Sequence, residues 1–101
     1  MNIYTKLITT SILMCLAGIV SAAGDAAAGK EKAALCAACH GADGISPNDL
    51  WPNLKGQKFG YMVKQLKALR DGSRTDPMMS PMAAPLTDED IDNLAAYFSS
   101  M

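Results

Sequence analysis

The pentapeptide Cys36-Ala37-Ala38-Cys39-His40 constrains this chain more than any other feature. A C-x-x-C-H pattern is typical of covalent haem attachment, in which two cysteines form thioethers and the adjacent imidazole binds one axial face of the iron. His40 is the only histidine in the sequence, so a second imidazole ligand is excluded. The pattern therefore predicts one covalently bound haem c, attached at Cys36 and Cys39, with His40 as an iron ligand.

The first 22 residues have the three-part form of a secretory signal peptide. Lys6 provides a basic start, residues 7–20 are largely apolar, and Val20-Ser21-Ala22 provides small residues for cleavage. The apolar stretch is shorter than the roughly 20 residues that a membrane-spanning helix needs. We therefore expect cleavage after Ala22, export to the periplasm, and a mature domain of residues 23–101 with no membrane span. Lipid attachment at Cys15 is a less favoured alternative.

Two other uses of a C-x-x-C pair have less support. A thiol–disulfide pair is expected near a βαβ pattern, and the sequence shows no such pattern. A structural zinc site needs four ligands, whereas the expected mature domain offers Cys36, Cys39 and His40. Haem attachment is therefore the favoured interpretation of the motif.

Helical spacing of apolar residues and the absence of alternating strands predict an all-α fold, with three to four helices packed around the haem. We expect a first helix from the N-cap Asp25 to Cys36, and a second helix over Phe59–Arg70. A last helix is expected to start at Thr87, where Thr87 and Asp90 resemble a capping box. The turn-forming residues of Gly41–Gly56 predict a loop.

Prolines interrupt residues 76–85, which we predict to be a stiff loop without a regular helix. The loop carries Met78, Met79 and Met82. A methionine thioether at the sixth iron position would favour electron transfer over catalysis at an open iron. Spacing alone does not choose among these methionines, and lysine ligation is a less favoured alternative.

The charge pattern gives information about possible partners more than about the fold. The net charge is −1, which is not typical of a nucleic-acid-binding domain. Basic residues predominate from 55 to 75 and acidic residues from 76 to 101. This separation can orient a protein partner, although ordinary solvated helix faces explain it equally well.

These motifs together resemble the class I c-type cytochromes, in particular the short bacterial type with one haem. The resemblance rests on Cys36–Gly41, on Pro52–Gly56, and on the methionine loop before a C-terminal helix that ends in Leu94–Phe98. The segments Gly41–Gly44 and Leu54–Gln57 also resemble one half of the dihaem cytochromes c of bacterial respiratory chains. The 101 residues contain one haem motif.

The resemblance implies an axial ligand set for the iron. His40 would be one ligand, and a methionine of the loop would be the other. The family pattern places this methionine seven residues before a hydrophobic position such as Leu86, which selects Met79. Met82 is the runner-up and Met78 comes third.

The resemblance also implies the surroundings of the haem. The carbonyl of Pro52 would accept a hydrogen bond from the far nitrogen of His40, and Pro52 and Leu54 would lie near the haem. The first and last helices would cross near Gly29 and Tyr97. These expectations concern contacts between distant parts of the chain.

The implied function is a periplasmic protein, not an enzyme, that carries single electrons between protein donors and acceptors. An alternative is the cytochrome subunit of a larger oxidoreductase, such as a flavin-containing sulfide dehydrogenase, with a catalytic subunit as its permanent partner. A haem sensor or peroxidase with an open iron site is less favoured, because the methionine loop can close that site.

Overall fold

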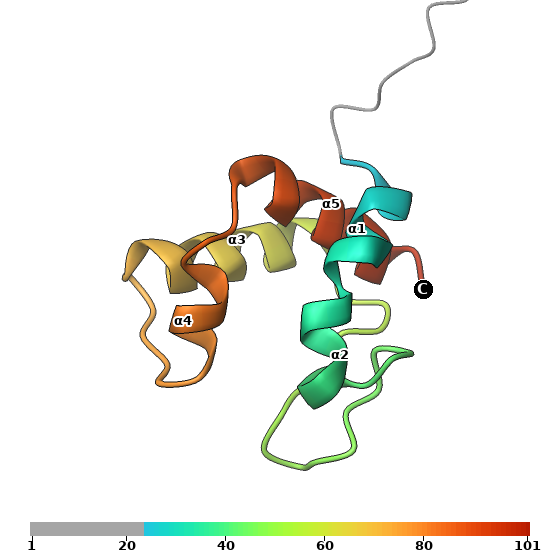
Figure 1. The fold of residues 1–101 in the computed structure, drawn as a ribbon, viewed down its shortest axis with the longest axis horizontal. Coiled ribbons are helices and arrows are strands. Elements are labelled where there is room, and N and C mark those ends of the chain that lie inside the picture. Colours follow the sequence, from blue (N-terminus) through green and yellow to red (C-terminus); the bar gives the residue numbers. More distant parts are fainter. Residues whose placement is uncertain (1–23) are drawn as a thin grey trace, which may run out of the picture.

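The computed structural model of this chain describes residues 24–101, and its elements are shown in Figure 1. The helices are α1 (Ala26–Lys32), α2 (Ala34–His40), α3 (Phe59–Asp71), α4 (Met79–Ala83) and α5 (Asp88–Ser99). Residues 24–101 contain no strand, so the predicted all-α fold is confirmed. No helix in this range has the length and apolar character needed to cross a membrane. The predicted signal peptide, residues 1–22, lies outside the described residues.

The N-terminal helical region is longer than predicted. Asp25 is the N-cap of α1, as expected, and its carboxylate accepts hydrogen bonds from the backbone N–H groups of Ala27 and Ala28 at 2.8 and 3.3 Å. The predicted end at Cys36 was wrong, because the chain passes through a short break at Ala33 and continues as α2 to His40. Alanine-rich sequence favours this continuation, since no helix breaker occurs before residue 41. The complete haem motif therefore lies on one helix.

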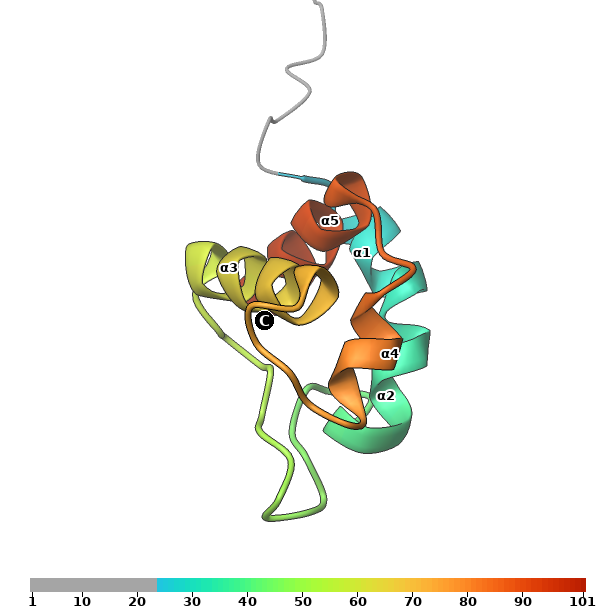
Figure 2. The same cartoon turned by 90° about the vertical axis from the view of Figure 1, so that its left-hand side faces the viewer.

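The helices α1 and α5 lie side by side in Figures 1 and 2, and Gly29 allows their close approach. A Cβ atom on Gly29 would lie 1.9 Å from the carbonyl oxygen of Asn93 and 2.9 Å from Cβ of Tyr97. Asn93 is buried, and its side-chain oxygen accepts a hydrogen bond from the Asp25 backbone N–H at 2.7 Å. The expected crossing near Gly29 and Tyr97 is confirmed.

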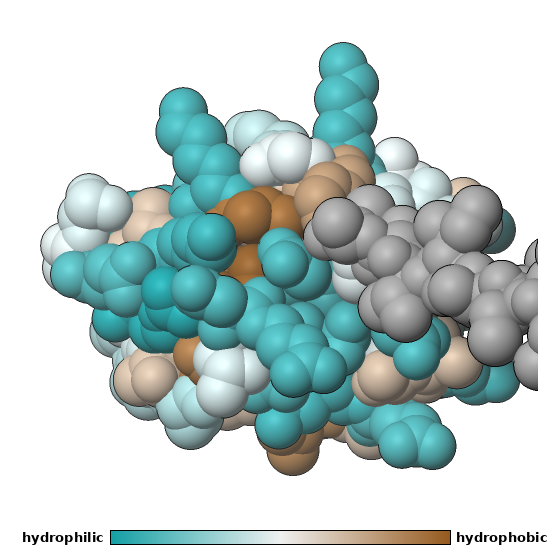
Figure 3. All heavy atoms as spheres, turned by 90° about the horizontal axis from the view of Figure 1, so that it is seen from above, coloured by the Kyte–Doolittle hydropathy of each residue, from teal (hydrophilic) through white to brown (hydrophobic). Residues whose placement is uncertain are grey.

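The helix α5 supplies more of the buried hydrophobic residues than any other helix in residues 24–101. Its capping box is present as predicted: Thr87 Oγ1 accepts from the Asp90 N–H, and an Asp90 carboxylate oxygen accepts from the Thr87 N–H, both at 3.0 Å. The buried stripe predicted for this helix is also confirmed, by Ile91, Leu94, Ala95 and Phe98. Figure 3 shows one face of the molecule, which is largely hydrophilic with a few apolar atoms exposed between the polar ones.

The proline-rich segment contains a short helix, so the prediction of a loop without regular helix was wrong. Pro81 is the third residue of α4. A proline is tolerated there because backbone N–H groups in the first turn of a helix have few intrahelical acceptors. Pro85 follows the end of α4, where a proline cannot disturb helical hydrogen bonds.

Candidate haem site

The helix α2 places the cysteines and the histidine of the motif together. Residues three and four positions apart are neighbours on a helix surface, so Cys36, Cys39 and His40 share one side of α2. Both thiols are free and partly buried. Burial raises the pKa of the Cys36 thiol, and Cys36 packs against the core cluster that includes Phe98. The motif is therefore held against the core by α2.

The His40 ring is buried and oriented by one hydrogen bond. Its Nδ1 atom lies 2.7 Å from the carbonyl oxygen of Pro52. A carbonyl can only accept, so Nδ1 carries a proton, and in the neutral ring Nε2 then carries the free lone pair. Nε2 has no hydrogen-bond partner among residues 24–101. The contact implied by the resemblance is present, and it leaves Nε2 available to a metal.

The loop that carries Pro52 is anchored on both sides. The carbonyl oxygen of Gly44 accepts from the N–H groups of Leu54 and Lys55 at 2.8 and 3.0 Å. The N–H of Ser46 donates to the side-chain oxygen of Asn53 at 2.7 Å. These bonds tie the residues after Pro52 to the first half of the loop, so the Pro52 carbonyl has a fixed position relative to α2.

The methionines lie on or beside α4, across from α2. In Figure 1 the two helices stand on either side below α3, and no Cα atom of α2 lies within 8 Å of a Cα atom of α4. Met79 is half-buried, whereas Met78 and Met82 are 55% and 45% exposed. The structure thus places the imidazole and the methionines on separate elements that do not pack directly on each other.

Several large apolar side chains of the loop, α3 and the methionine segment are exposed to solvent, namely Ile45, Leu50, Tyr61, Met78 and Met82. Among residues 24–101, no three His, Cys, Asp or Glu side chains gather as a site for a bare metal ion. Free thiols, an oriented imidazole, thioethers and uncovered apolar surface together fit a haem.

Residues 26–101 match the protein family described as cytochrome c. The chain belongs to the cytochrome c family. Proteins of this family transfer electrons and bind a covalently attached haem c with its iron, and haem c is accordingly the cofactor of this chain.

Similar cytochromes differ from this one in length. Cytochrome c4 of Pseudomonas aeruginosa is 47% identical over 94 residues, which cover 93% of this chain and 47% of that protein. Cytochrome c-554(548) of Halomonas halodenitrificans is 51% identical over 81 residues, which cover 77% of this chain and 98% of that protein. The chain therefore spans about half of cytochrome c4 and nearly the full length of cytochrome c-554(548).

A solved structure has the same fold. The crystal structure of reduced recombinant cytochrome c4 from Pseudomonas stutzeri superposes with a TM-score of 0.74 at 45% identity. The match covers 78% of this chain and 46% of that one. This agreement confirms the small cytochrome c fold expected from the motifs.

The sequence analysis missed the residues that hold the methionine segment of this cytochrome in place. Asp76 counted only as part of an acidic region, yet its carboxylate accepts from the N–H groups of Met79 and Met78 at 2.7 and 2.9 Å. These hydrogen bonds lower the pKa of Asp76. The dipeptide Asp76-Pro77 was the available sign, since aspartate followed by proline is typical of a turn.

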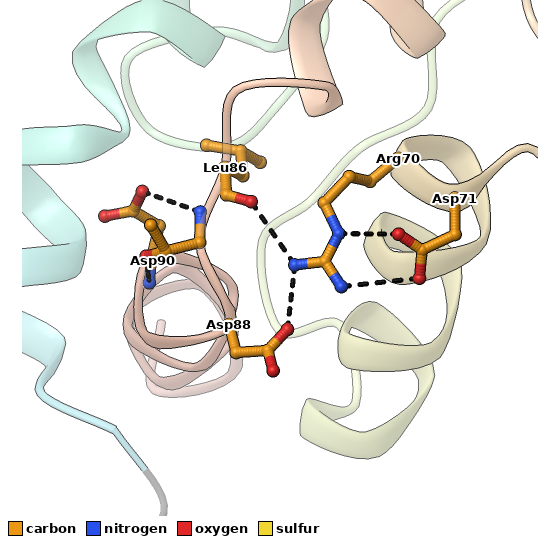
Figure 4. Close-up of polar contacts among 6 residues, drawn as sticks. Arg70, Asp71, Leu86, Asp88 and Asp90 are labelled. Carbon is orange, nitrogen blue, oxygen red and sulfur yellow. Dashed lines mark hydrogen bonds and ion pairs between the residues drawn. The ribbon is translucent and has the colours of Figure 1, made fainter.

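Arg70 was also missed, and it closes the base of the methionine segment (Figure 4). Its Nη1 donates to the Asp88 carboxylate at 2.7 Å and to the Leu86 carbonyl at 3.3 Å, while its Nε donates to Asp71 at 2.8 Å. The end of α3 is thereby tied to the start of α5. No local sequence pattern indicates this contact between residues 18 positions apart.

Proposed function

We propose that this cytochrome is a periplasmic carrier of single electrons, exported by a signal peptide at residues 1–22. Its haem c would be attached at Cys36 and Cys39, with His40 and Met79 as axial iron ligands. The observation that supports this proposal most is the hydrogen bond from His40 Nδ1 to the Pro52 carbonyl, which leaves Nε2 free for iron. The family match supports electron transfer as the activity.

The residues of α2 have distinct tasks in this proposal. Haem c, when bound, supplies the one-electron change between ferric and ferrous iron. Cys36 and Cys39 would hold the group covalently, and Nε2 of His40 would donate its lone pair to the iron. The Pro52 carbonyl fixes the ring orientation and raises the basicity of the imidazole through Nδ1–H.

Met79 would close the sixth position with its thioether. A methionine ligand stabilises the ferrous state and raises the reduction potential. Met79 is the least exposed of the candidate methionines, and its backbone N–H is fixed by Asp76. A filled sixth position keeps small molecules from the iron, so Met79 favours electron transfer over a sensor or peroxidase function.

Separate replacement of two methionines tests the ligand. Oxidised wild-type holoprotein should show the methionine-to-iron charge-transfer band. Met79→Ala should abolish the band, and Met82→Ala should retain it because Met82 serves as the matched control. The opposite pattern would move the ligand to Met82. A wild type without the band that binds carbon monoxide rapidly in the ferrous state would support an open iron site instead.

The partner can be tested apart from the ligand. On gel filtration of a periplasmic extract, a free carrier should elute alone. It should exchange electrons with soluble redox proteins in brief encounters. Stable co-purification with a catalytic protein would instead support the alternative of a permanent oxidoreductase subunit, such as that of a flavin-containing sulfide dehydrogenase.

A further inference from the structure

The start of α4 is organised by Asp76. Its side-chain oxygen accepts hydrogen bonds from the backbone N–H groups of Met78 at 2.9 Å and Met79 at 2.7 Å. Its backbone oxygen accepts from the Ser80 N–H at 3.0 Å, which is the first helical bond of this turn. Asp76 therefore caps the turn that precedes α4, and its side chain satisfies the N–H groups of Met78 and Met79, which the helix itself leaves unpaired.

Ser80 returns a hydrogen bond to Asp76. Its Oγ atom accepts from the Asp76 backbone N–H at 2.9 Å. Each residue thus donates to the other and accepts from it, which is the logic of a capping box. Both residues are half-buried, whereas Pro77 and Met78 between them are exposed. The pair encloses the turn that leads into Met79.

This pair matters because α4 has little other support. The helix has 5 residues, and an isolated helix of that length is not stable in water. Within the described part of the chain, α3 is the only helix on which α4 packs. Ala83, near its end, is fully buried, but the start of α4 has no such anchor. The hydrogen bonds of Asp76 and Ser80 therefore determine where the Met79 backbone lies.

We propose that Asp76 and Ser80 are positioning residues for the axial methionine, because their reciprocal hydrogen bonds hold the Met79 backbone in place. This inference rests on the proposed function, in which Met79 binds the iron. Loss of the pair leaves the thioether able to reach the iron but less restrained. The methionine then leaves the iron more often, and an external ligand enters more readily.

The rate at which imidazole binds to the ferric holoprotein measures this effect, since imidazole must wait for the methionine to leave. Asp76→Ala should increase the imidazole binding rate about fivefold, the factor that corresponds to loss of a typical N-cap. Ser80→Ala should increase it by a smaller factor. Asp76→Asn should stay within about twofold of the wild type, because an asparagine side chain caps as well as aspartate does.

Asp25→Ala provides the matched control. It removes the N-cap of α1, where the Asp25 carboxylate also accepts from two backbone N–H groups, and α1 carries no proposed iron ligand. Its thermal midpoint should fall as far as that of Asp76→Ala, while its imidazole binding rate should equal that of the wild type. A merely structural role for Asp76 would make the two variants alike in both measurements.

The outcomes separate this inference from the proposed function. If Met79→Ala loses the charge-transfer band while Asp76→Ala binds imidazole no faster than Asp25→Ala, the positioning role is overturned and the ligand assignment stands. If Met79→Ala retains the band, the ligand assignment fails, and the positioning of an axial ligand by Asp76 fails with it. Faster imidazole binding by Asp76→Ala, together with a wild-type rate in Asp76→Asn, supports both the ligand assignment and the positioning role.

Discussion

The contact at Gly29 shows how one residue can decide whether two helices pack. An ideal Cβ atom there would lie 1.9 Å from the backbone oxygen of Asn93, which is far inside van der Waals contact. Backbone cannot move aside as a flexible side chain can, so any larger residue must push α1 away from α5. The packing role of Gly29 in α1 therefore outweighs the low helix propensity of glycine.

We predict that Gly29→Ala destabilises the protein by about 1–3 kcal/mol, the usual cost of overpacking. The gain in helix propensity from alanine, about 1 kcal/mol, is too small to reverse the sign. Thermal unfolding of the holoprotein measures the change. Gly60→Ala is the matched control, because Gly60 lies in α3 with nothing within 4 Å of its Cβ position. Equal midpoints for the two variants would contradict the steric argument.

Residues differ in how far sequence alone reveals their roles. The haem motif could be predicted because its chemistry depends on neighbouring residues of one helix. The hydrogen bond between Asn93 and the Asp25 backbone joins residues 68 positions apart, and no local pattern encodes it. The same holds for the position of Pro52 beside His40, which came from family resemblance and not from spacing.

At the level of helices, start points were easier to predict than the behaviour of prolines. Asp25 and Thr87 cap α1 and α5 through bonds to residues two or three positions away, so short-range rules found them. The helix α4 was missed because the three prolines Pro77, Pro81 and Pro85 were expected to exclude a regular helix. A helix of little more than one turn loses little from a proline, and contact with α3 supplies its remaining support.

The bonds of Arg70 connect helices rather than stabilise one helix. Arg70 lies near the end of α3, and its partners Leu86 and Asp88 lie at the start of α5 (Figure 4). The segment between them includes α4 and the candidate methionines. Closing this segment at its base reduces the freedom of everything it carries, including the position of Met79.

We predict that Arg70→Gln lowers the thermal midpoint slightly, on the order of a few degrees, since exposed ion pairs contribute little. Hydrogen bonds from Arg70 lower the pKa values of Asp71 and Asp88. Their contribution is therefore complete above about pH 4, the usual aspartate range, and is lost as the pH falls through the lowered values. The difference in thermal midpoint between wild type and Arg70→Gln should therefore decrease as the pH falls below about 4.

Lys32→Gln serves as the control for this pH experiment. Lys32 pairs with Asp90 at 3.5 Å, a longer and single contact that does not close the methionine segment. Its effect on the midpoint should be smaller than that of Arg70→Gln at neutral pH. A gap between wild type and Arg70→Gln that stays constant down to pH 2 would show that Asp71 and Asp88 contribute nothing through Arg70.

Several helices of this molecule make few contacts with one another. The buried cluster is small, comprising Ala33, Met62, Leu94, Ala95 and Phe98. Among the helices of residues 24–101, only α1 has Cα atoms within 8 Å of those of α2, and only α3 has Cα atoms within 8 Å of those of α4. A domain of this size has a marginal core, so the haem is expected to supply the contacts that join α2 to α4.

We predict that the double variant Cys36→Ala/Cys39→Ala, which cannot attach haem covalently, loses roughly half or more of its helical circular dichroism at 25 °C. The short helices α2 and α4 should be lost first, because neither has enough length or packing to form alone. The α1–α5 pair keeps its direct contact through Gly29 and should retain more structure. Circular dichroism and hydrogen exchange of the haem-free protein measure both effects.

The variant Met79→Ala distinguishes the contribution of the covalently attached haem to stability from that of the axial methionine. That variant should keep its haem through the cysteines and retain most of its helical signal, because apolar contact with the porphyrin remains. Its unfolding midpoint should lie between those of the wild type and the double cysteine variant. If the haem-free double variant instead unfolds cooperatively near the wild-type midpoint, the polypeptide alone holds α2 and α4 in place, and the haem only occupies a site that is already formed.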